Sequence, residues 1–207
     1  MSESPWPTIH AEREALLEDL AGLSAEQWNT PSLCPNWSVS DVVGHMTATA
    51  RMTPGRFFGH FIGAGFKFHQ MSAKDVAAET AQGHDHLLAE FRAVSSASTA
   101  PPGPIDAMLG EAIVHPADIR RPLGIAHDYP VDAVCRAADF YAGSNLLIGS
   151  KKRIEGLKLR ATDTEWTHGE GPEVTGPAMS LLQAMTGRGV ALDDLSGAGL
   201  TTLRSRF

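Results

Sequence analysis

The chain has 207 residues, 43% of them hydrophobic and 20% charged, which is the composition of an ordinary globular protein. This length provides for one sizeable hydrophobic core, or for one domain with a small appendage. The formal net charge of −7 argues against a general nucleic-acid-binding protein, because such a protein needs a basic face. We therefore expect no nucleic-acid partner.

The sequence also bears on the compartment. It has only two cysteines, Cys34 and Cys135, which favours a reducing environment over a disulfide framework. The first twenty residues lack the basic and apolar regions of a signal peptide. No apolar run approaches the roughly 18 residues that would span a bilayer. A cytoplasmic protein without a membrane partner is expected.

The first predicted element is an amphipathic helix over 7–22, where leucine and isoleucine recur at helical spacing between charged residues. A loop with prolines separates it from a second helix. Ser38 is suited to cap this second helix, and Asp41, three residues later, completes a pattern close to a capping box. The second helix carries His45 among valine and methionine residues and is expected to end near Thr53.

The middle of the chain is less uniform. Residues 55–71 are rich in glycine and phenylalanine, and their pattern selects neither helix nor strand. A long helix fits 73–95 and is followed by a loop at 98–104. Two further helices are expected over about 105–121 and about 130–149.

Towards the C-terminus the pattern changes. Alternation over 157–166 predicts a strand, and a short helix with a proline near its start follows over 176–189. Residues 200–207 predict a last strand. The chain is therefore predicted to be mainly α, with a metal-binding helical bundle over 1–153 and a small α+β C-terminal domain over 154–207.

Glu111 and His115 lie four residues apart in the helix predicted over about 105–121. Side chains at this spacing share one helix face, with Cβ atoms about 5–6 Å apart, so both can reach one ion. His45 is the best candidate for a third ligand, because bundles build metal sites from inward-facing side chains of neighbouring helices. Two histidines and one carboxylate leave open coordination positions, which is typical of catalytic zinc and also suits ferrous iron or nickel.

Spacing alone leaves another interpretation open. A Glu–His pair at this spacing is common on solvated helix faces, where Glu111 would be exposed and His115 a core histidine. His84 and His86 are a weaker candidate pair, because residues two apart in a helix do not face each other. Cys34 is predicted to be a structural, half-buried cysteine, because the sequence places no histidine beside it to activate the thiol.

Two motifs resemble the mycothiol-dependent maleylpyruvate isomerase family, within the wider DinB-like four-helix superfamily. The first, CPNWSVSDVVGHM at 34–46, has the family's Cys-Pro, Trp, capping residue and Asp ahead of a His. The second, EAIVHPADIRRPLG at 111–124, has Glu-x-x-x-His, then an acidic residue, an Arg pair and Pro-Leu-Gly. The segments ATDTEWTHGEG and GPAMSLLQAMTGR resemble the family's small C-terminal domain. The resemblance covers most of the chain, and 55–100 is its least distinctive part.

The resemblance implies a DinB-like four-helix bundle with a divalent metal, usually zinc, held by His45, Glu111 and His115. It also implies mycothiol, a low-molecular-weight thiol, as the cosubstrate that attacks a small electrophile. A metal favours the thiolate form of such a thiol. The reaction is then a maleylpyruvate-type cis–trans isomerisation or an S-transfer. The family's C-terminal arginine matches Arg188, whose guanidinium is suited to clamp a substrate carboxylate as a catalytic residue.

Two other functions stay consistent with the sequence. A non-catalytic DinB-like protein would bind a metal or small molecule without turnover, because fold does not dictate function. A metal-assisted hydrolase would use zinc-bound water in place of the thiol. The sequence does not identify the electrophile.

Overall fold

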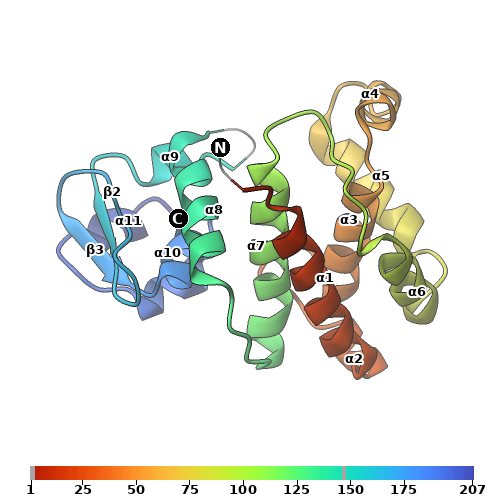
Figure 1. Ribbon diagram of the computed structural model, residues 1–207, viewed down its shortest axis with the longest axis horizontal. Helices are drawn as coiled ribbons and strands as arrows, with labels where there is room; N and C mark the ends of the chain where they lie inside the picture. The colour runs from red at the N-terminus through yellow and green to blue at the C-terminus, as the bar shows by residue number, and fades with distance from the viewer. Residues whose placement is uncertain (1–2, 146–147) are drawn as a thin grey trace. The chain divides into compact units, whose positions relative to one another are not determined.

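The structure is a computed structural model that describes residues 3–145 and 148–207 (Figure 1). It is mainly helical, with a small three-stranded sheet in the C-terminal part, as predicted. The contacts divide the chain into two compact units, and the division falls between His127 and Asp128. Within the described residues, no helix is both long and apolar enough to cross a membrane.

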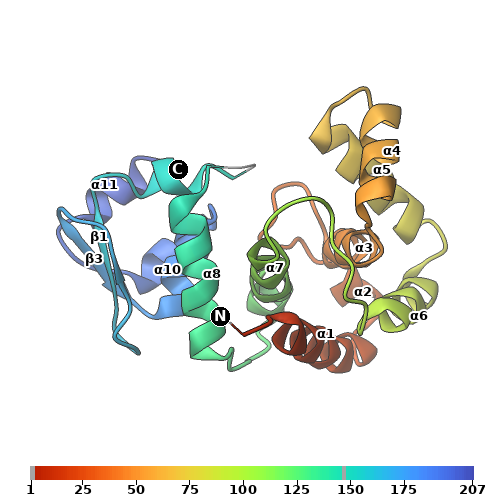
Figure 2. The same ribbon diagram turned by 45° about the horizontal axis from the view of Figure 1, so that its top comes forward.

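The first unit is built from seven helices of the described chain: α1 (Trp6–Ala21), α2 (Ala25–Trp28), α3 (Val39–Ala50), α4 (Pro54–Gly63), α5 (Phe68–Thr80), α6 (His84–Val94) and α7 (Asp106–Leu123). Helices α1, α6, α3 and α7 pack against one another in that cyclic order around a common core, so they form a four-helix bundle (Figure 2). All four contribute fully buried side chains to the core, for example Leu16, Val43, Phe91 and Ile119. Helix α5 packs on the outside of α3.

The helix that carries His45 begins as predicted. The Ser38 hydroxyl accepts a hydrogen bond from the Asp41 backbone N–H, and the Asp41 carboxylate accepts one from the Ser38 N–H. This capping box satisfies two backbone donors that a helix N-terminus otherwise leaves unpaired. Gly44 lets α5 approach closely, because a Cβ there would lie 3.0 Å from the Thr80 side chain. His45 thereby lies in the second turn of a helix that is capped at its start and packed against α5.

The long helix predicted over 73–95 is wrong. The chain forms two helices there, α5 and α6, separated by a turn at Gly83. Gly83 has a φ of +86°, a conformation that costs glycine little and interrupts a right-handed helix. The apolar periodicity continues across this turn because both helices bury residues against α3, so periodicity alone did not reveal the break. The unassigned segment 55–71 forms α4 and the first turn of α5.

The second unit contains these elements: α8 (Val131–Gly143), α9 (Ser150–Arg153), β1 (Lys158–Ala161), β2 (Thr167–His168), β3 (Glu173–Gly176), α10 (Ala178–Met185), the 3-10 helix η1 (Gly189–Asp194) and α11 (Leu200–Arg204). The strand order is β2-β1-β3. Strand β1 pairs antiparallel with β2 and parallel with β3, with Leu159 opposite His168 and Val174. Helices α8 and α10 pack together.

Two C-terminal predictions need correction. The expected last strand at 200–207 is the short helix α11, in which Leu203 is buried and its neighbours are exposed. Ser196 already forms a bridge to β3 through Thr175, so the chain ends its sheet pairing before Leu200. The helix predicted over 130–149 ends earlier, at Gly143, and residues 146–147 of that prediction lie outside the described residues.

The two compact units meet at residues 127 and 128, whereas the predicted domain boundary lies between residues 153 and 154. Helix α8 was predicted as part of the bundle, but it packs against α9 and α10 and so groups with the second unit. Its alanine-rich buried face fits closely against another short helix, which explains the grouping. The predicted boundary remains a prediction about independently folding domains.

Candidate active site between α3 and α7

The predicted residues of α3 and α7 meet where these two helices of the first unit pack together. The imidazole rings of His45 and His115 lie edge to face, with their centroids 5.1 Å apart. Trp37 covers the His45 ring from the preceding loop, also at 5.1 Å between centroids. The structure thus brings the two predicted histidines into contact.

Glu111 lies on α7 one turn before His115, and its carboxyl group is largely surrounded by protein. Burial raises the pKa of Glu111 to about 8, although the nearby Arg13 guanidinium and a hydrogen bond with Thr49 act in the opposite direction. Thr49 lies one turn after His45 on α3. Glu111 is therefore directed into the contact between helices, and the exposed Glu111 of the alternative interpretation is not observed.

His45 is held in its neutral form. Burial, with a smaller contribution from the adjacent His115, lowers the pKa of His45 to about 3. Its Nδ1 atom lies 3.4 Å from the Ser72 hydroxyl of α5. Nδ1 of His115 faces Asp118, at 3.0 Å. Among the described residues, neither histidine forms a hydrogen bond through Nε2.

These properties fit a divalent cation. A metal ligand must be a neutral imidazole or an ionised carboxylate, so a cation competes with protons for these groups and binds more tightly as the pH rises. His45 is neutral at pH 7 because of its environment. Burial raises the pKa of Glu111 more than the nearby Arg13 lowers it. A bound cation would favour the ionised carboxylate. Two imidazoles with free Nε2 atoms and one carboxyl group are donor types that zinc accepts. Among the described residues, however, the ligand atoms of His45, Glu111 and His115 do not all lie within 4.8 Å of one another, so a shared ion would require these side chains to move closer together.

A second group of polar atoms lies on the Nδ1 side of His115. Cys34 Sγ is 3.1 Å from Asp118 Oδ2 and 3.5 Å from His115 Nδ1. Among the residues that the structure describes, these three form the one group of His, Cys, Asp or Glu side chains whose ligand atoms all lie within 4.8 Å of one another. The predicted absence of a histidine beside Cys34 is therefore wrong. The contact joins residues 81 apart, so sequence proximity could not reveal it.

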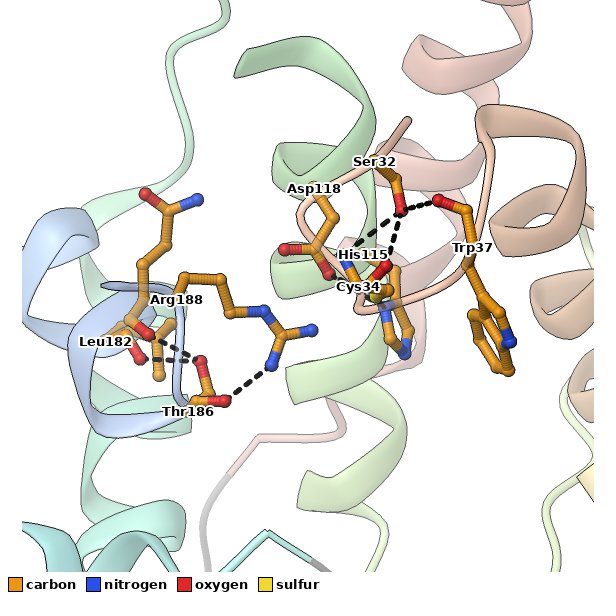
Figure 3. Close-up of polar contacts among 9 residues, drawn as sticks. Ser32, Cys34, Trp37, His115, Asp118, Leu182, Thr186 and Arg188 are labelled. Atoms are coloured by element: carbon orange, nitrogen blue, oxygen red, sulfur yellow. Dashed lines mark hydrogen bonds and ion pairs between the residues drawn. The ribbon is translucent and has the colours of Figure 1, made fainter. Parts of the chain in front are cut away.

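The loop before α3 positions Cys34 (Figure 3). Cys34 to Trp37 form a tight turn, closed by the Trp37 N–H donating to the Cys34 carbonyl, with Pro35 second and Asn36 third at a φ of +65°. A proline followed by a residue with positive φ is typical of a type II turn, and asparagine tolerates that conformation. The Leu33 N–H donates to the Asp118 carbonyl at 3.1 Å, which fastens the loop to α7.

Helix α7 is also tied to α1 by ion pairs. Arg120, which is buried, donates from Nε to Asp19 at 2.7 Å and lies 3.7 Å from the Glu12 carboxylate. Breaking such a pair by removing one partner leaves a buried charge uncompensated. Arg120 therefore serves to fix α7 within the bundle.

The weaker histidine pair does not form a site. His84 stacks on Trp28 with ring centroids 5.1 Å apart and an interplanar angle of 12°. This contact lies at the start of α6 and links it to α2. Among the described residues, the one cluster of three potential metal-ligating side chains contains neither His84 nor His86.

Arg188 belongs to the second unit, in the turn between α10 and η1. Its Nη1 atom donates to the Thr186 carbonyl at 2.7 Å (Figure 3). Its backbone N–H donates to the Gln183 carbonyl. The like charge of Arg188 also contributes to a lowered pKa for Arg153, after burial of that guanidinium. The turn thus holds the Arg188 side chain in a defined orientation.

Fold and site together define a class: a four-helix bundle with two facing histidines and a carboxyl group between α3 and α7, followed by a small α+β unit. Residues 9–120 match the family model described as the mycothiol maleylpyruvate isomerase N-terminal domain, and the chain belongs to this family. The matched segment contains His45, Glu111 and His115. The family resemblance predicted from the two motifs is confirmed.

Two solved crystal structures have a similar fold. They are the mycothiol-dependent maleylpyruvate isomerase, with a TM-score of 0.65, and a histidine-to-alanine mutant of that enzyme, with a TM-score of 0.64. Each is 14% identical to this chain, and each comparison covers 93% of this chain and 91% of the other. The similarity therefore includes the fold of the C-terminal unit. No match was found among curated protein sequences.

Proposed function

We propose that the protein is a metal-dependent enzyme in which a low-molecular-weight thiol, mycothiol, attacks an electrophilic substrate. The observation that carries this proposal is the contact of His45 and His115 across α3 and α7, with Glu111 one turn away, inside the segment that matches the family. His45, Glu111 and His115 are the proposed metal ligands, and Zn²⁺ is the metal that such a donor set favours. A thiol-dependent isomerase as a structural relative supports the thiol as cosubstrate.

The metal, when bound, supplies Lewis acidity that lowers the pKa of a nearby thiol. The protein's own residues exclude water and set the geometry. Trp37 packs against the His45 ring, and the residues that follow His45 and precede His115, Met46 and Val114, are buried. Partial exclusion of water strengthens electrostatic interactions within the site. Ser72 contacts His45 and Thr49 contacts Glu111, so both side chains have restricted freedom to rotate.

The chemistry of the substrate follows from a thiolate nucleophile. Attack on a carbon–carbon double bond conjugated to a carbonyl forms a carbon–sulfur bond, and the electron pair moves to the carbonyl oxygen. The former double bond can then rotate. Expulsion of the thiolate restores the double bond in the other geometry, which is a cis–trans isomerisation. If the sulfur stays attached and the carbanion takes a proton, or if another group leaves, the reaction is an S-transfer.

The test is turnover with defined reagents. Zinc-loaded protein is incubated with mycothiol and either maleylpyruvate or a panel of conjugated enones, epoxides and alkyl halides, and products are identified by mass spectrometry. We expect an isomer or a thiol conjugate that requires both thiol and metal. Glu111→Ala is expected to lower the rate at least about 100-fold, because loss of a metal ligand removes the transition-state stabilisation that the ion supplies. Glu18→Ala, at an exposed position of α1, is the matched control.

Each alternative function has its own result in this assay. Turnover that is independent of the thiol would replace the proposal with metal-assisted hydrolysis. Metal binding with no turnover of any substrate would replace it with a non-catalytic binding protein. Full activity in Glu111→Ala would contradict the proposed ligand set.

Arg188 is proposed to bind a carboxylate of the substrate. Replacing Arg188 with alanine is expected to raise KM for a carboxylate-bearing substrate by about 10- to 100-fold, because a hydrogen bond to a charged group contributes about 1.5–3 kcal/mol. Arg188→Lys is expected to recover only part of this loss, since lysine cannot form the bidentate contact. Metal content should stay unchanged, and Arg204→Ala, at an exposed ion pair, is the control. An unchanged KM in Arg188→Ala would exclude the role.

A further inference from the structure

The two ring nitrogens of His115 face different surroundings. Nδ1 lies 3.0 Å from Asp118 Oδ2, one turn further along α7. The ring also lies edge to face with that of His45, and Nε2 of His115 has no hydrogen bond in the part of the chain that the structure describes. A neutral imidazole carries one proton, so the partner of Nδ1 decides which nitrogen keeps a lone pair.

Asp118 is suited to make that decision. Its side chain is 0% exposed, and Cys34, 8% exposed, lies 3.1 Å from the same oxygen that faces His115. A buried carboxylate accepts hydrogen bonds and cannot donate them. The thiol of Cys34 and the Nδ1–H of His115 then both donate to Asp118 Oδ2. The turn from Cys34 to Trp37 and the Leu33–Asp118 backbone bond fix this arrangement.

We propose that Asp118 and Cys34 are positioning residues that hold His115 as its Nδ1–H tautomer, so that the Nε2 lone pair points to the metal of the proposed function. Cys34 is in this view a neutral thiol donor to Asp118, and neither a metal ligand nor the nucleophile. A carboxylate that orients a ligating histidine through its other nitrogen is a recurring arrangement in metal sites. The inference rests on the proposed function for the metal, but the tautomer itself does not require one.

The competing arrangement is a metal held directly by Cys34, His115 and Asp118. Tetrahedral zinc with bonds of about 2.0–2.3 Å separates its ligand atoms by about 3.3–3.6 Å. The N–O and S–O distances of 3.0 and 3.1 Å are shorter than this and agree with hydrogen bonds. Only the S–N distance of 3.5 Å fits both arrangements. The distances therefore favour the positioning role.

The first experiment uses the metal-free protein. Long-range ¹H–¹⁵N NMR of the histidine rings reports the tautomer of His115 directly. We expect Nδ1–H in the wild type and a shift towards Nε2–H in Asp118→Asn, because the amide can donate to Nδ1 and so favour the other tautomer. Cys34→Ser, which keeps a hydroxyl donor, should behave as the wild type. An Nε2–H tautomer in the wild type would overturn the proposal, whether or not the protein binds metal.

The second experiment measures the metal site with Co²⁺ as a spectroscopic probe. We expect a cobalt spectrum without a sulfur-to-cobalt charge-transfer band, and a metal affinity that falls about 10- to 100-fold in Asp118→Asn and by less in Cys34→Ala. A charge-transfer band that disappears in Cys34→Ala would make Cys34 a ligand and overturn the inference. Unchanged affinity in Asp118→Asn would overturn it as well. No cobalt bound by the wild type would contradict the proposed function, while the NMR result would still decide the tautomer.

Discussion

Replacing His115 with alanine is expected to reduce the bound divalent metal from about one ion per chain to nearly none, because the variant would keep only two of three protein ligands. The His45–His115 ring contact at 5.1 Å places the lost imidazole against the other proposed imidazole ligand. Elemental analysis of untagged protein, purified and then supplied with zinc, measures the number of metal ions per chain. Thiol-dependent turnover should be lost in parallel.

The control for this variant is His86→Ala, which removes an imidazole from α6 outside the proposed site. It should retain the metal ratio of the wild type. Circular dichroism of both variants separates loss of metal from loss of fold. A wild-type metal ratio in His115→Ala would exclude His115 as a ligand, and an absence of zinc from all three proteins would reduce Glu111 and His115 to a structural pair.

The largest effect on stability is expected from Phe91→Ala. Phe91 is 0% exposed on α6 and lies in the core that α1, α3, α6 and α7 share. Truncation of a buried phenylalanine removes apolar contacts and leaves a cavity, which costs about 3–5 kcal/mol. The midpoint of urea unfolding, followed by tryptophan fluorescence, should fall accordingly. Trp28, buried in the same core, provides a signal for the first unit.

Phe58→Ala makes the same chemical change at a position of α4 that is 55% exposed. Its effect on the free energy of unfolding should stay within about 0.5 kcal/mol, as for most surface substitutions. Equal destabilisation by the two variants would show that the buried core of the first unit is not organised around α6 in solution.

The bundle and the candidate ligands were predictable because their signals are local. The α3 N-terminus follows from Ser38 and Asp41, which interact across a single helical turn. Glu111 and His115 share a helix face because they are four residues apart in a helix. The family motifs associate this pair with His45. The family match over 9–120 confirms the resemblance, while the ligand set remains a prediction.

Other features depend on packing between distant segments. The break at Gly83 is invisible to apolar periodicity, because α5 and α6 both pack against α3. Helix α11 forms where a strand was expected: β3 is already bridged by Ser196, and the chain after it buries Leu203 as part of a helix. In both places tertiary contacts override a local preference for longer helix or strand.

By itself, the sequence determined the helical bundle, the capped helix that carries His45 and the one-turn spacing of Glu111 and His115, because each depends on residues close along the chain. Only the tertiary structure decided what surrounds them. It placed the His45 and His115 rings in contact, set the half-buried Glu111 beside Thr49 and brought Cys34 to Asp118 across 84 positions. Contacts between distant residues arise from how helices pack around a shared core, and that arrangement is a property of the whole chain.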